Sequence, residues 1–392
     1  MIKYTVRDLE KPIKATLKRG KSILLFGARQ TGKTTLIKRL EHDLYISLAA
    51  SPIRIKFEKD PGLLIREIQA LEQPNSKKPL IIIDEVQKVP ALLDSIQYLI
   101  DENNAQFILT GSSARKLTRG PHINLLPGRV VVLRLDPYNL SEHESISLNH
   151  ALIYGSLPGI LATKNKHDRE TDLISYVDTY LEEEVRAEAI VRNIGAFARF
   201  LELAASESGN IINLHKLSTE IGVAHTTISA YYQILEDCLI AHRVEPITQS
   251  KTRKKLTKSQ KYLFFDLGVR RIAAKEGIQL PRQALGHIFE QMVGLELIRM
   301  ARLNANNTTI KFWRDPGGPE VDWIIENNKQ WLPIEVKWTD NPQPKDIRHL
   351  KVFLNEYSNT EKGYIICRCS HRLKMSNQIT AIPWQDIPTL FK

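Results

Sequence analysis

A glycine-rich stretch near the start of the chain restricts the fold more than any other feature. The apolar run Ile23–Phe26 leads into the pattern Gly-x-x-x-x-Gly-Lys-Thr, which begins at Gly27 and ends at Thr34. Glycines let the backbone approach phosphate oxygens closely, and successive N–H groups then point into one concavity. We therefore predict a phosphate-binding loop between a buried strand and an amphipathic helix, whose apolar side carries Leu36, Ile37 and Leu40.

The polar groups of this loop suit a nucleotide and its metal ion. Lys33 is expected to reach the β- and γ-phosphates, and the Thr34 hydroxyl is expected to ligate Mg²⁺. The N-terminus of the following helix adds a partial positive charge at the same place. We therefore expect ATP and Mg²⁺ as cofactors, with the nucleotide held by Gly27, Ala28, Arg29, Gln30, Thr31, Gly32, Lys33, Thr34 and Thr35.

A second apolar run, Leu80–Ile83, ends in the acidic pair Asp84 and Glu85. A continuous apolar run is typical of a central strand in a parallel sheet, and ligands bind at the carboxyl ends of such strands. Asp84 is predicted to hold Mg²⁺, directly or through water, and Glu85 to polarise the attacking water as a general base. The alternative is a capped strand end with two solvated acids.

A third apolar run, Gln106–Leu109, also has a polar end. The hydroxyl of Thr110, Ser112 or Ser113 is a candidate sensor of the γ-phosphate, and we place Ser112 in the predicted nucleotide site. A strand-to-loop cap is the alternative.

Arg129 lies in a loop that enters another predicted strand. A planar cation is suited to stabilising a transferring phosphoryl group. We predict that Arg129 acts on the nucleotide of a neighbouring subunit, which requires a homo-oligomer; a surface arginine is the alternative.

The composition indicates a protein of two to four domains that works in a reducing cytoplasm. The chain has 392 residues and three cysteines without the spacing of a disulfide framework or a zinc site. No apolar run approaches the length of a membrane span, and the first residues lack the apolar core of a signal peptide. The net charge of +11 favours a polyanionic partner, although charge for general solubility is the alternative.

Residues 208–268 have the pattern of a DNA-binding module. Leu214–Ile221, a turn at Gly222 and His225–Glu236 predict a helix-turn-helix, and two later runs, 239–245 and 261–265, predict a hairpin that completes a winged helix. The predicted DNA contacts are His225, Thr226 and Thr227 on the second helix and Arg253, Lys254 and Lys255 at the tip of the hairpin. The second helix has no base-reading arginine, so a packing or protein-contact module is the alternative.

Beyond residue 284, one hairpin register separates charged from apolar side chains. If Glu326 faces Trp331, then Asp322 faces Glu335 and Glu320 faces Lys337. We then expect the other face to be wholly apolar, and a slip of one residue would break both sets. That predicted apolar face carries Val321, Trp323, Ile325, Leu332, Ile334 and Val336.

Several of these motifs, taken in order, resemble the AAA+ ATPase family that carries a DUF4143 region. The resemblance rests on the loop at 27–34, Ile-Ile-Asp-Glu-Val-Gln at 82–87, Leu-Thr-Gly-Ser-Ser at 109–113 and Pro-Gly-Arg-Val at 127–130. Weaker matches follow, such as Pro-Tyr-Asn-Leu-Ser-Glu at 137–142 and Pro-Ile-Glu-Val-Lys at 333–337. The family implies an ATPase core, a helical lid, a winged helix and a nuclease-like terminus.

The order of elements after residue 284 resembles the restriction-endonuclease-like fold. Asp322 followed by Glu335-x-Lys337 matches its Asp…Glu-x-Lys motif, and Glu290 on the preceding helix matches its helix acid. The resemblance implies that Asp322 and Glu335 share one Mg²⁺ and that Lys337 orients or activates water. Asp322 follows valine where the motif has proline. The alternative is a retained fold in which these residues form a structural ion-pair cluster.

Together these observations predict an α/β chain with four domains. We expect a P-loop AAA+ core with a parallel sheet at 1–136, a helical lid at 137–207, a winged helix-turn-helix at 208–275 and an α+β restriction-endonuclease-like domain at 276–392. The predicted function is Mg²⁺-dependent ATP hydrolysis that controls DNA binding and the nuclease-like domain. A nucleotide-controlled protein-interaction switch and a transcriptional regulator with an inert nuclease-like domain are the alternatives.

Overall fold

The chain forms two compact units, which we describe separately. A computed structural model describes residues 4–71, 78–112, 128–143, 145–181, 193–250, 256–304 and 307–391, with side chains omitted at 180 and 181. The first unit contains the residues up to Pro137 together with Asp237–Leu239, and the second contains Tyr138–Glu236 and the residues from Ile240 onward.

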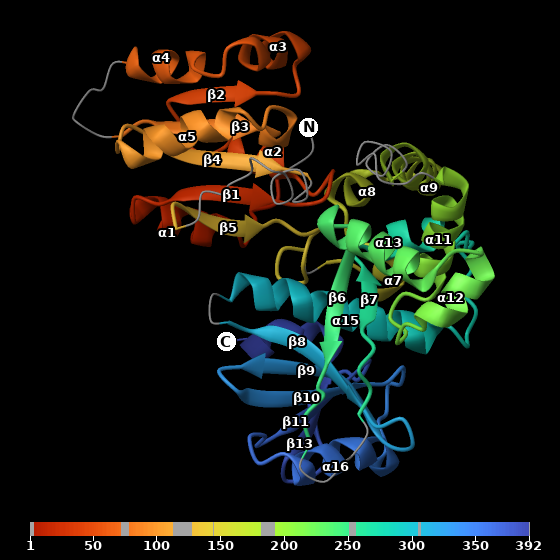
Figure 1. Ribbon diagram of the computed structural model, residues 1–392. Coiled ribbons are helices and arrows are strands. Elements are labelled where there is room, and N and C mark those ends of the chain that lie inside the picture. Colours follow the sequence, from red (N-terminus) through yellow and green to blue (C-terminus); the bar gives the residue numbers. More distant parts are fainter. Residues whose placement is uncertain are drawn as a thin grey trace. The chain divides into compact units, whose positions relative to one another are not determined.

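A five-stranded parallel sheet forms the centre of the first unit (Figure 1). The strand order is β2-β3-β4-β1-β5, and every neighbouring pair is parallel. This arrangement confirms the predicted α/β class with a parallel sheet. The strands are β1 (Ser22–Phe26), β2 (Leu44–Ser47), β3 (Leu80–Asp84), β4 (Gln106–Gly111) and β5 (Val130–Arg134).

The central strands are buried on both faces, as their unbroken apolar runs predict. Ile81, Ile82 and Ile83 are each 0% exposed, although successive side chains of a strand point to opposite faces. Both faces are therefore covered, as a parallel sheet requires. The helices of this unit are α1 (Glu10–Lys18), α2 (Lys33–Ile37), α3 (Ser51–Lys59), α4 (Leu63–Gln69) and α5 (Leu92–Asp101).

A mixed eight-stranded sheet forms the centre of the second unit, in the order β12-β13-β11-β10-β9-β8-β6-β7. Helix α15 (Leu285–Leu303) packs on one face of this sheet with Trp323 and Ile334, and α16 (Arg348–Glu356) packs on the other with Trp313 and Ile365. The strands are β6 (Ala241–Pro246), β7 (Lys261–Phe264), β8 (Thr309–Arg314), β9 (Glu320–Asn327), β10 (Gln330–Val336), β11 (Gly363–Cys367), β12 (Leu373–Lys374) and β13 (Ile379–Pro383).

The remaining helices of the second unit precede the long strands of this sheet. They include the two helices of the predicted helix-turn-helix, which begin and end within one residue of the predicted positions, and Gly222 between them has the expected left-handed backbone (φ +80°). The helices are α7 (Leu148–Tyr154), α8 (Pro158–Ala162), α9 (Lys166–Ser175) with a π-helical turn at Tyr176–Leu181, α11 (Ile194–Ser206), α12 (Leu214–Ile221), α13 (His225–Asp237) and α14 (Leu267–Ala273).

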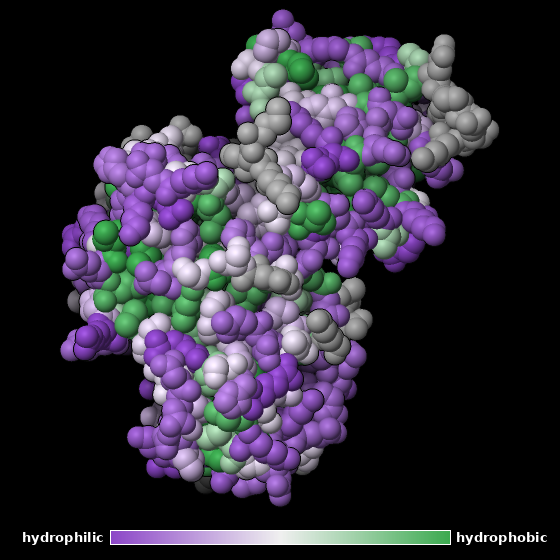
Figure 2. Space-filling model, turned by 180° about the vertical axis from the view of Figure 1, so that it is seen from behind, coloured by the Kyte–Doolittle hydropathy of each residue, from purple (hydrophilic) through white to green (hydrophobic). Residues whose placement is uncertain are grey.

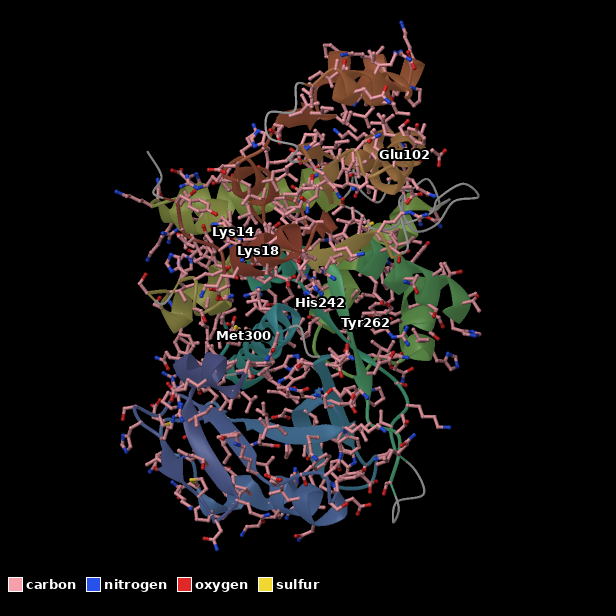
Figure 3. All side chains as sticks on the ribbon, turned by 90° about the vertical axis from the view of Figure 1, so that its left-hand side faces the viewer. Lys14, Lys18, Glu102, His242, Tyr262 and Met300 are labelled. Carbon is pink, nitrogen blue, oxygen red and sulfur yellow. The ribbon has the colours of Figure 1, made fainter. Side chains whose placement is uncertain are left out.

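The hairpin β6–β7 belongs to the same sheet as the strands that follow it. Residues 245 and 246 of β6 pair in parallel with 311 and 312 of β8. Figure 3 labels His242 and Tyr262 on this hairpin and Met300 on α15. Apart from Pro137 and Asp237–Leu239, the three predicted domains 137–207, 208–275 and 276–392 lie within one compact unit. Local sequence patterns do not reveal this arrangement, because they carry no information about which edge strands pair.

The predicted hairpin register is confirmed, but the predicted position of Val321 on the apolar face is wrong. Glu326 pairs with Trp331 and Trp323 with Ile334, as counted from the sequence. Against β8, however, Lys311 pairs with Ile324 while the next aligned pair is Trp313 with Val321. Three residues of β9 thus span two of β8, which is a β-bulge. Val321 consequently packs with the residues around α16 and not with Trp323.

Candidate functional site

The loop after β1 has the close backbone contacts that its glycines predict. A Cβ atom on Gly27 would lie 2.5 Å from the carbonyl oxygen of Leu135, so a side chain does not fit there. Gly32 has φ +95°, a conformation that side chains disfavour, and it is the residue before α2. These two positions explain why the loop requires glycine at each end.

Lys33 lies against the loop that it is predicted to serve. Its Nζ donates hydrogen bonds to the carbonyl oxygens of Gly27, at 2.7 Å, and Ala28, at 3.0 Å. The Thr31 hydroxyl also donates to the Ala28 carbonyl, at 2.9 Å. The ammonium group is therefore held at the turn of the loop, where phosphate oxygens would bind.

Asp84 and Thr34 form the contact expected of a magnesium pair. The Thr34 hydroxyl donates to Oδ2 of Asp84 at 2.9 Å, and the hydroxyls of Tyr45, at 3.0 Å, and Thr110 also donate to this carboxylate. Burial, followed by the charge of Asp84, raises the pKa of Tyr45 to about 12, so its hydroxyl stays protonated. A hydroxyl beside a carboxylate fits Mg²⁺ bound together with a nucleotide phosphate. Nothing in the sequence around Tyr45 identified it as part of this site.

Glu85 adopts an unusual backbone conformation at the end of β3. Its φ is +63°, which is uncommon for a residue with a side chain and concentrates at functional sites. Its N–H donates to the Thr110 hydroxyl at 3.0 Å, and the Ser112 hydroxyl donates to its Oε2 at 3.4 Å. Gln87 donates to both Glu85 and Ser112. The structure thus brings Ser112 to Glu85, whereas Ser113 lies outside the described residues.

Arg129 lies at the start of β5, at the opposite end of the strands from the loop of its own chain. The next residue, Val130, pairs with Ser22 at the start of β1, whereas the loop follows the end of that strand. Arg129 forms two hydrogen bonds with Asp101, Nε–Oδ1 at 2.6 Å and Nη2–Oδ2 at 2.9 Å, and the hydrogen bond lowers the pKa of Asp101. Arg134 is the arginine of β5 that pairs beside Phe26, next to the loop.

Arg7 joins the N-terminal segment to the loop, and the sequence analysis did not identify it. Its guanidinium donates to the carbonyl oxygens of Thr31 and Asp136, each at 2.7 Å. Arg7 is buried although it lies in no predicted motif. Only the three-dimensional structure shows that Arg7 connects the N-terminal segment to the loop.

The predicted residues of the second charged site also come together. Lys337 Nζ donates to Oε1 of Glu335 at 2.6 Å, and the Val336 N–H donates to Oδ2 of Asp322 at 2.7 Å. Glu290 of α15 forms an ion pair with Lys261, at 3.0 Å. In the described residues, the second carboxylate oxygen of Glu335 is buried without a hydrogen-bond donor.

The electrostatics of this cluster favour protonated acids. Burial, with the charges of Glu335 and Glu290, raises the pKa of Asp322 well above its usual range. Burial also raises the pKa of Glu335, to about 7, although Lys337 opposes the shift. Among the residues that the structure describes, no three acidic, histidine or cysteine side chains form a set that could ligate a metal ion. The predicted Mg²⁺ site at Asp322 and Glu335 uses only two such side chains and stays a prediction.

The structure describes three of the six predicted DNA-contacting residues. His225 and Thr226 are exposed at the beginning of α13, and Thr227 is half-buried. Ile228, Tyr232 and other apolar residues of this helix are buried, as the pattern predicts. The tip residues Arg253, Lys254 and Lys255 lie outside the described part of the chain.

Comparison with protein families divides the chain into three matched regions. Residues 19–144 match the family described as AAA domain. Residues 146–279 match a domain of unknown function, DUF8612, and residues 285–387 match another, DUF4143. The first match defines the class of the first unit, an AAA-type nucleotide-binding domain, and the third confirms the predicted DUF4143 region. The predicted boundary at 207/208 falls inside the DUF8612 match.

Two relatives are similar along nearly the whole chain. The uncharacterized protein Rv2008c of Mycobacterium tuberculosis is 25% identical over 98% of this chain and 84% of its own length. The uncharacterized protein MJ1637 of Methanocaldococcus jannaschii is 24% identical over 93% of this chain and 83% of its own length. The AAA, DUF8612 and DUF4143 regions together thus have counterparts in bacteria and archaea.

Solved structures give only weak likenesses. The Bacillus subtilis DNA clamp loader delta protein has a TM-score of 0.25 at 10% identity, covering 58% of this chain and 87% of that chain. Protein VC1899 of Vibrio cholerae has a TM-score of 0.22 at 10% identity, covering 94% and 96%. Scores this low do not establish a shared fold.

Within the described ranges, none of the helices combines the length and the apolar character that a membrane crossing requires. The face shown in Figure 2 carries mainly hydrophilic side chains, with hydrophobic ones scattered among them.

Proposed function

We propose that this protein is a Mg²⁺-dependent ATPase of the AAA+ type whose nucleotide state controls DNA binding by the second unit. The observation that carries the proposal is the contact between Thr34 and Asp84 beside the Lys33 ammonium. Thr34 and Asp84 come from two predicted motifs 50 positions apart, and their side chains meet as two ligands of one Mg²⁺ ion would. The match of residues 19–144 to an AAA domain supports the same conclusion.

The residues of the site divide the chemistry between them. Lys33 and the loop N–H groups bind the phosphates, and Thr34 with Asp84 would hold Mg²⁺, which supplies positive charge to the transferring phosphoryl group. Glu85 orients and polarises the attacking water as general base. Ser112 and Gln87 hydrogen-bond the Glu85 carboxylate and fix its direction.

Substitution of the loop lysine and of the general base tests the ATPase assignment. We expect Lys33→Ala to abolish phosphate release, because the phosphates lose their principal cation. Glu85→Gln should bind ATP but hydrolyse it about 100-fold more slowly, because the base is lost while the binding groups remain. Exposed Lys59 at the end of α3 provides a control, since Lys59→Ala should retain activity. Unchanged phosphate release by Lys33→Ala would end the assignment.

The proposed DNA contacts are the exposed beginning of α13 and the basic hairpin tip. His225 and Thr226 present hydrogen-bonding groups there, and Arg253, Lys254 and Lys255 supply cations for backbone phosphates. The net charge of +11 supports a polyanionic partner. Because α13 has no arginine, we propose contact with phosphates more than with base edges.

Salt dependence distinguishes DNA binding from the runner-up, a nucleotide-controlled protein-interaction switch. Binding through phosphates should weaken steeply as salt rises, because each neutralised phosphate releases counterions. Neutralising Lys254 and Lys255 to glutamine should reduce the slope of log K against log salt by about 2. Fluorescence anisotropy of a labelled duplex at several salt concentrations measures this slope. Binding that does not depend on salt, or a slope unchanged in the double variant, would favour the protein-interaction switch.

A further inference from the structure

The carboxylate cluster of the second unit contains a cation that comes from the neighbouring hairpin. Lys261 is the first residue of β7, where it pairs with Val244 of β6, and it directly precedes Tyr262, which Figure 3 labels on this strand. Lys261 is only 9% exposed, and its Nζ lies 3.0 Å from Oε1 of Glu290. The edge strand β7 thus places the Lys261 ammonium group beside an acid of the cluster.

The surroundings of Lys261 hold its ammonium group in place. Nζ lies 4.9 Å from the ring centre of Trp323 and 5.1 Å from that of Phe312, and both rings are buried. Such cation–π contacts are strongest where water is excluded. Trp323 also donates a hydrogen bond to the backbone carbonyl of Glu290 at 3.2 Å, which ties the same ring to the helix that carries the acid.

Two lysine ammonium groups lie within this cluster of acids. The acids are Glu290, Asp322 and Glu335, and the cations are Lys261 and Lys337. The charge of Lys261 acts on Asp322 as well as on Glu290, because it is one of the groups that lower the pKa of Asp322. Two ammonium groups supply the same positive charge as one divalent ion.

We infer that Lys261, paired with Glu290, is the internal counter-ion of this cluster and takes the place that a divalent metal would have beside that acid. A divalent ion placed beside the buried ammonium would be repelled, because water screens the two charges poorly there. The residues present therefore do not fit a bound metal ion, although the acidic residues and lysine of the nuclease motif are retained. Metal-dependent cleavage of DNA is accordingly not part of the function proposed for this chain.

Divalent metal binding by the nucleotide-free full chain tests this inference. The probe is Mn²⁺ alone, titrated calorimetrically into the wild type, Lys261→Met and Lys261→Gln. Methionine keeps the unbranched apolar stem against the two rings while removing the charge. We expect both variants to gain a site that binds Mn²⁺ at least about tenfold more tightly than the wild type does. Lys261→Arg is the matched control and should gain no site.

A second substitution identifies the site that is gained. Asp322→Asn added to Lys261→Met should abolish the new Mn²⁺ site, whereas weak binding at Thr34 and Asp84 is unaffected. A wild-type site that Asp322→Asn removes would overturn the inference, and so would folded Lys261 variants that gain nothing. Tryptophan fluorescence monitors folding, since all five tryptophans lie in the second unit. The readout does not involve ATP, so this inference and the proposed ATPase fail independently.

Discussion

Asp84 and Glu85 are neighbours in sequence, yet the structure gives their carboxylates different surroundings. Asp84 is buried and accepts hydrogen bonds from three hydroxyl groups, those of Thr34, Tyr45 and Thr110. Glu85 leaves the strand through a left-handed backbone (φ +63°), which directs it to Ser112 and Gln87. The two settings match the roles proposed for these acids, which are Mg²⁺ binding by Asp84 and activation of water by Glu85.

At the scale of single residues, Glu335 should make the second unit less stable as pH rises. Its pKa is about 7 in the folded protein and about 4.5 when unfolded, so between these values only the folded state retains the proton. The stabilising contribution of Glu335 is therefore fully present below pH 4.5 and is lost as the pH rises to about 7. We expect Glu335→Gln to remove about 2 kcal/mol of this loss between pH 5 and pH 8, measured by urea unfolding with tryptophan fluorescence.

A second acid of the same sheet serves as the control for this measurement. Lys311, Trp331 and Thr309 hydrogen-bond Glu326 and lower its pKa, against the opposing effect of burial. The contribution of Glu326 is lost only as the pH falls through its lowered pKa. Glu326→Gln should consequently leave the pH dependence between pH 5 and pH 8 as in the wild type. Equal slopes for Glu335→Gln and the wild type would contradict the burial of Glu335 as an acid.

At the scale of elements, one aspartate joins two segments of the second unit. Asp266 is 0% exposed and precedes α14, where its carboxylate accepts the N–H groups of Gly268, at 2.9 Å, and Val269, at 3.2 Å. It also accepts the N–H of Ser156 at 2.7 Å, 110 residues earlier in the chain. This residue therefore caps a helix and fixes a distant loop with one side chain.

Replacing Asp266 should destabilise the second unit far more than removing an ordinary helix cap. Asp266→Ala leaves three buried N–H groups without an acceptor, and we expect a loss of about 3 kcal/mol in the free energy of unfolding. Asn165, which caps α9 through the N–H of His167 at 2.9 Å, is exposed, so Asn165→Ala should cost about 1 kcal/mol. Urea unfolding of both variants measures the difference. Equal losses would show that Asp266 acts only as a local cap.

The local elements could be predicted from sequence where hydrophobic period and turn chemistry agree. The loop after β1, the buried run ending at Asp84 and the two helices around Gly222 are examples of this agreement. Pairings between distant segments could not be predicted, because they depend on edges that the local pattern does not specify. The bulge that moves Val321 to the other face and the delivery of Lys261 to Glu290 are both of this kind.

At the scale of the whole molecule, the chain combines an AAA-type unit with a second unit that carries two regions of unknown function. Relatives in a bacterium and an archaeon are similar across all three regions. In the function proposed above, the nucleotide state of the first unit controls the second unit. This proposed control requires that the first unit binds a nucleotide.

The most direct test is a calorimetric titration of Mg·ATP, or of a slowly hydrolysed analogue, into the full chain. We predict one saturable nucleotide site per chain. Binding should disappear when magnesium is removed, and the affinity should fall strongly in Lys33→Ala. The absence of any binding heat on a sample whose tryptophan fluorescence and circular dichroism show a folded protein would contradict the account.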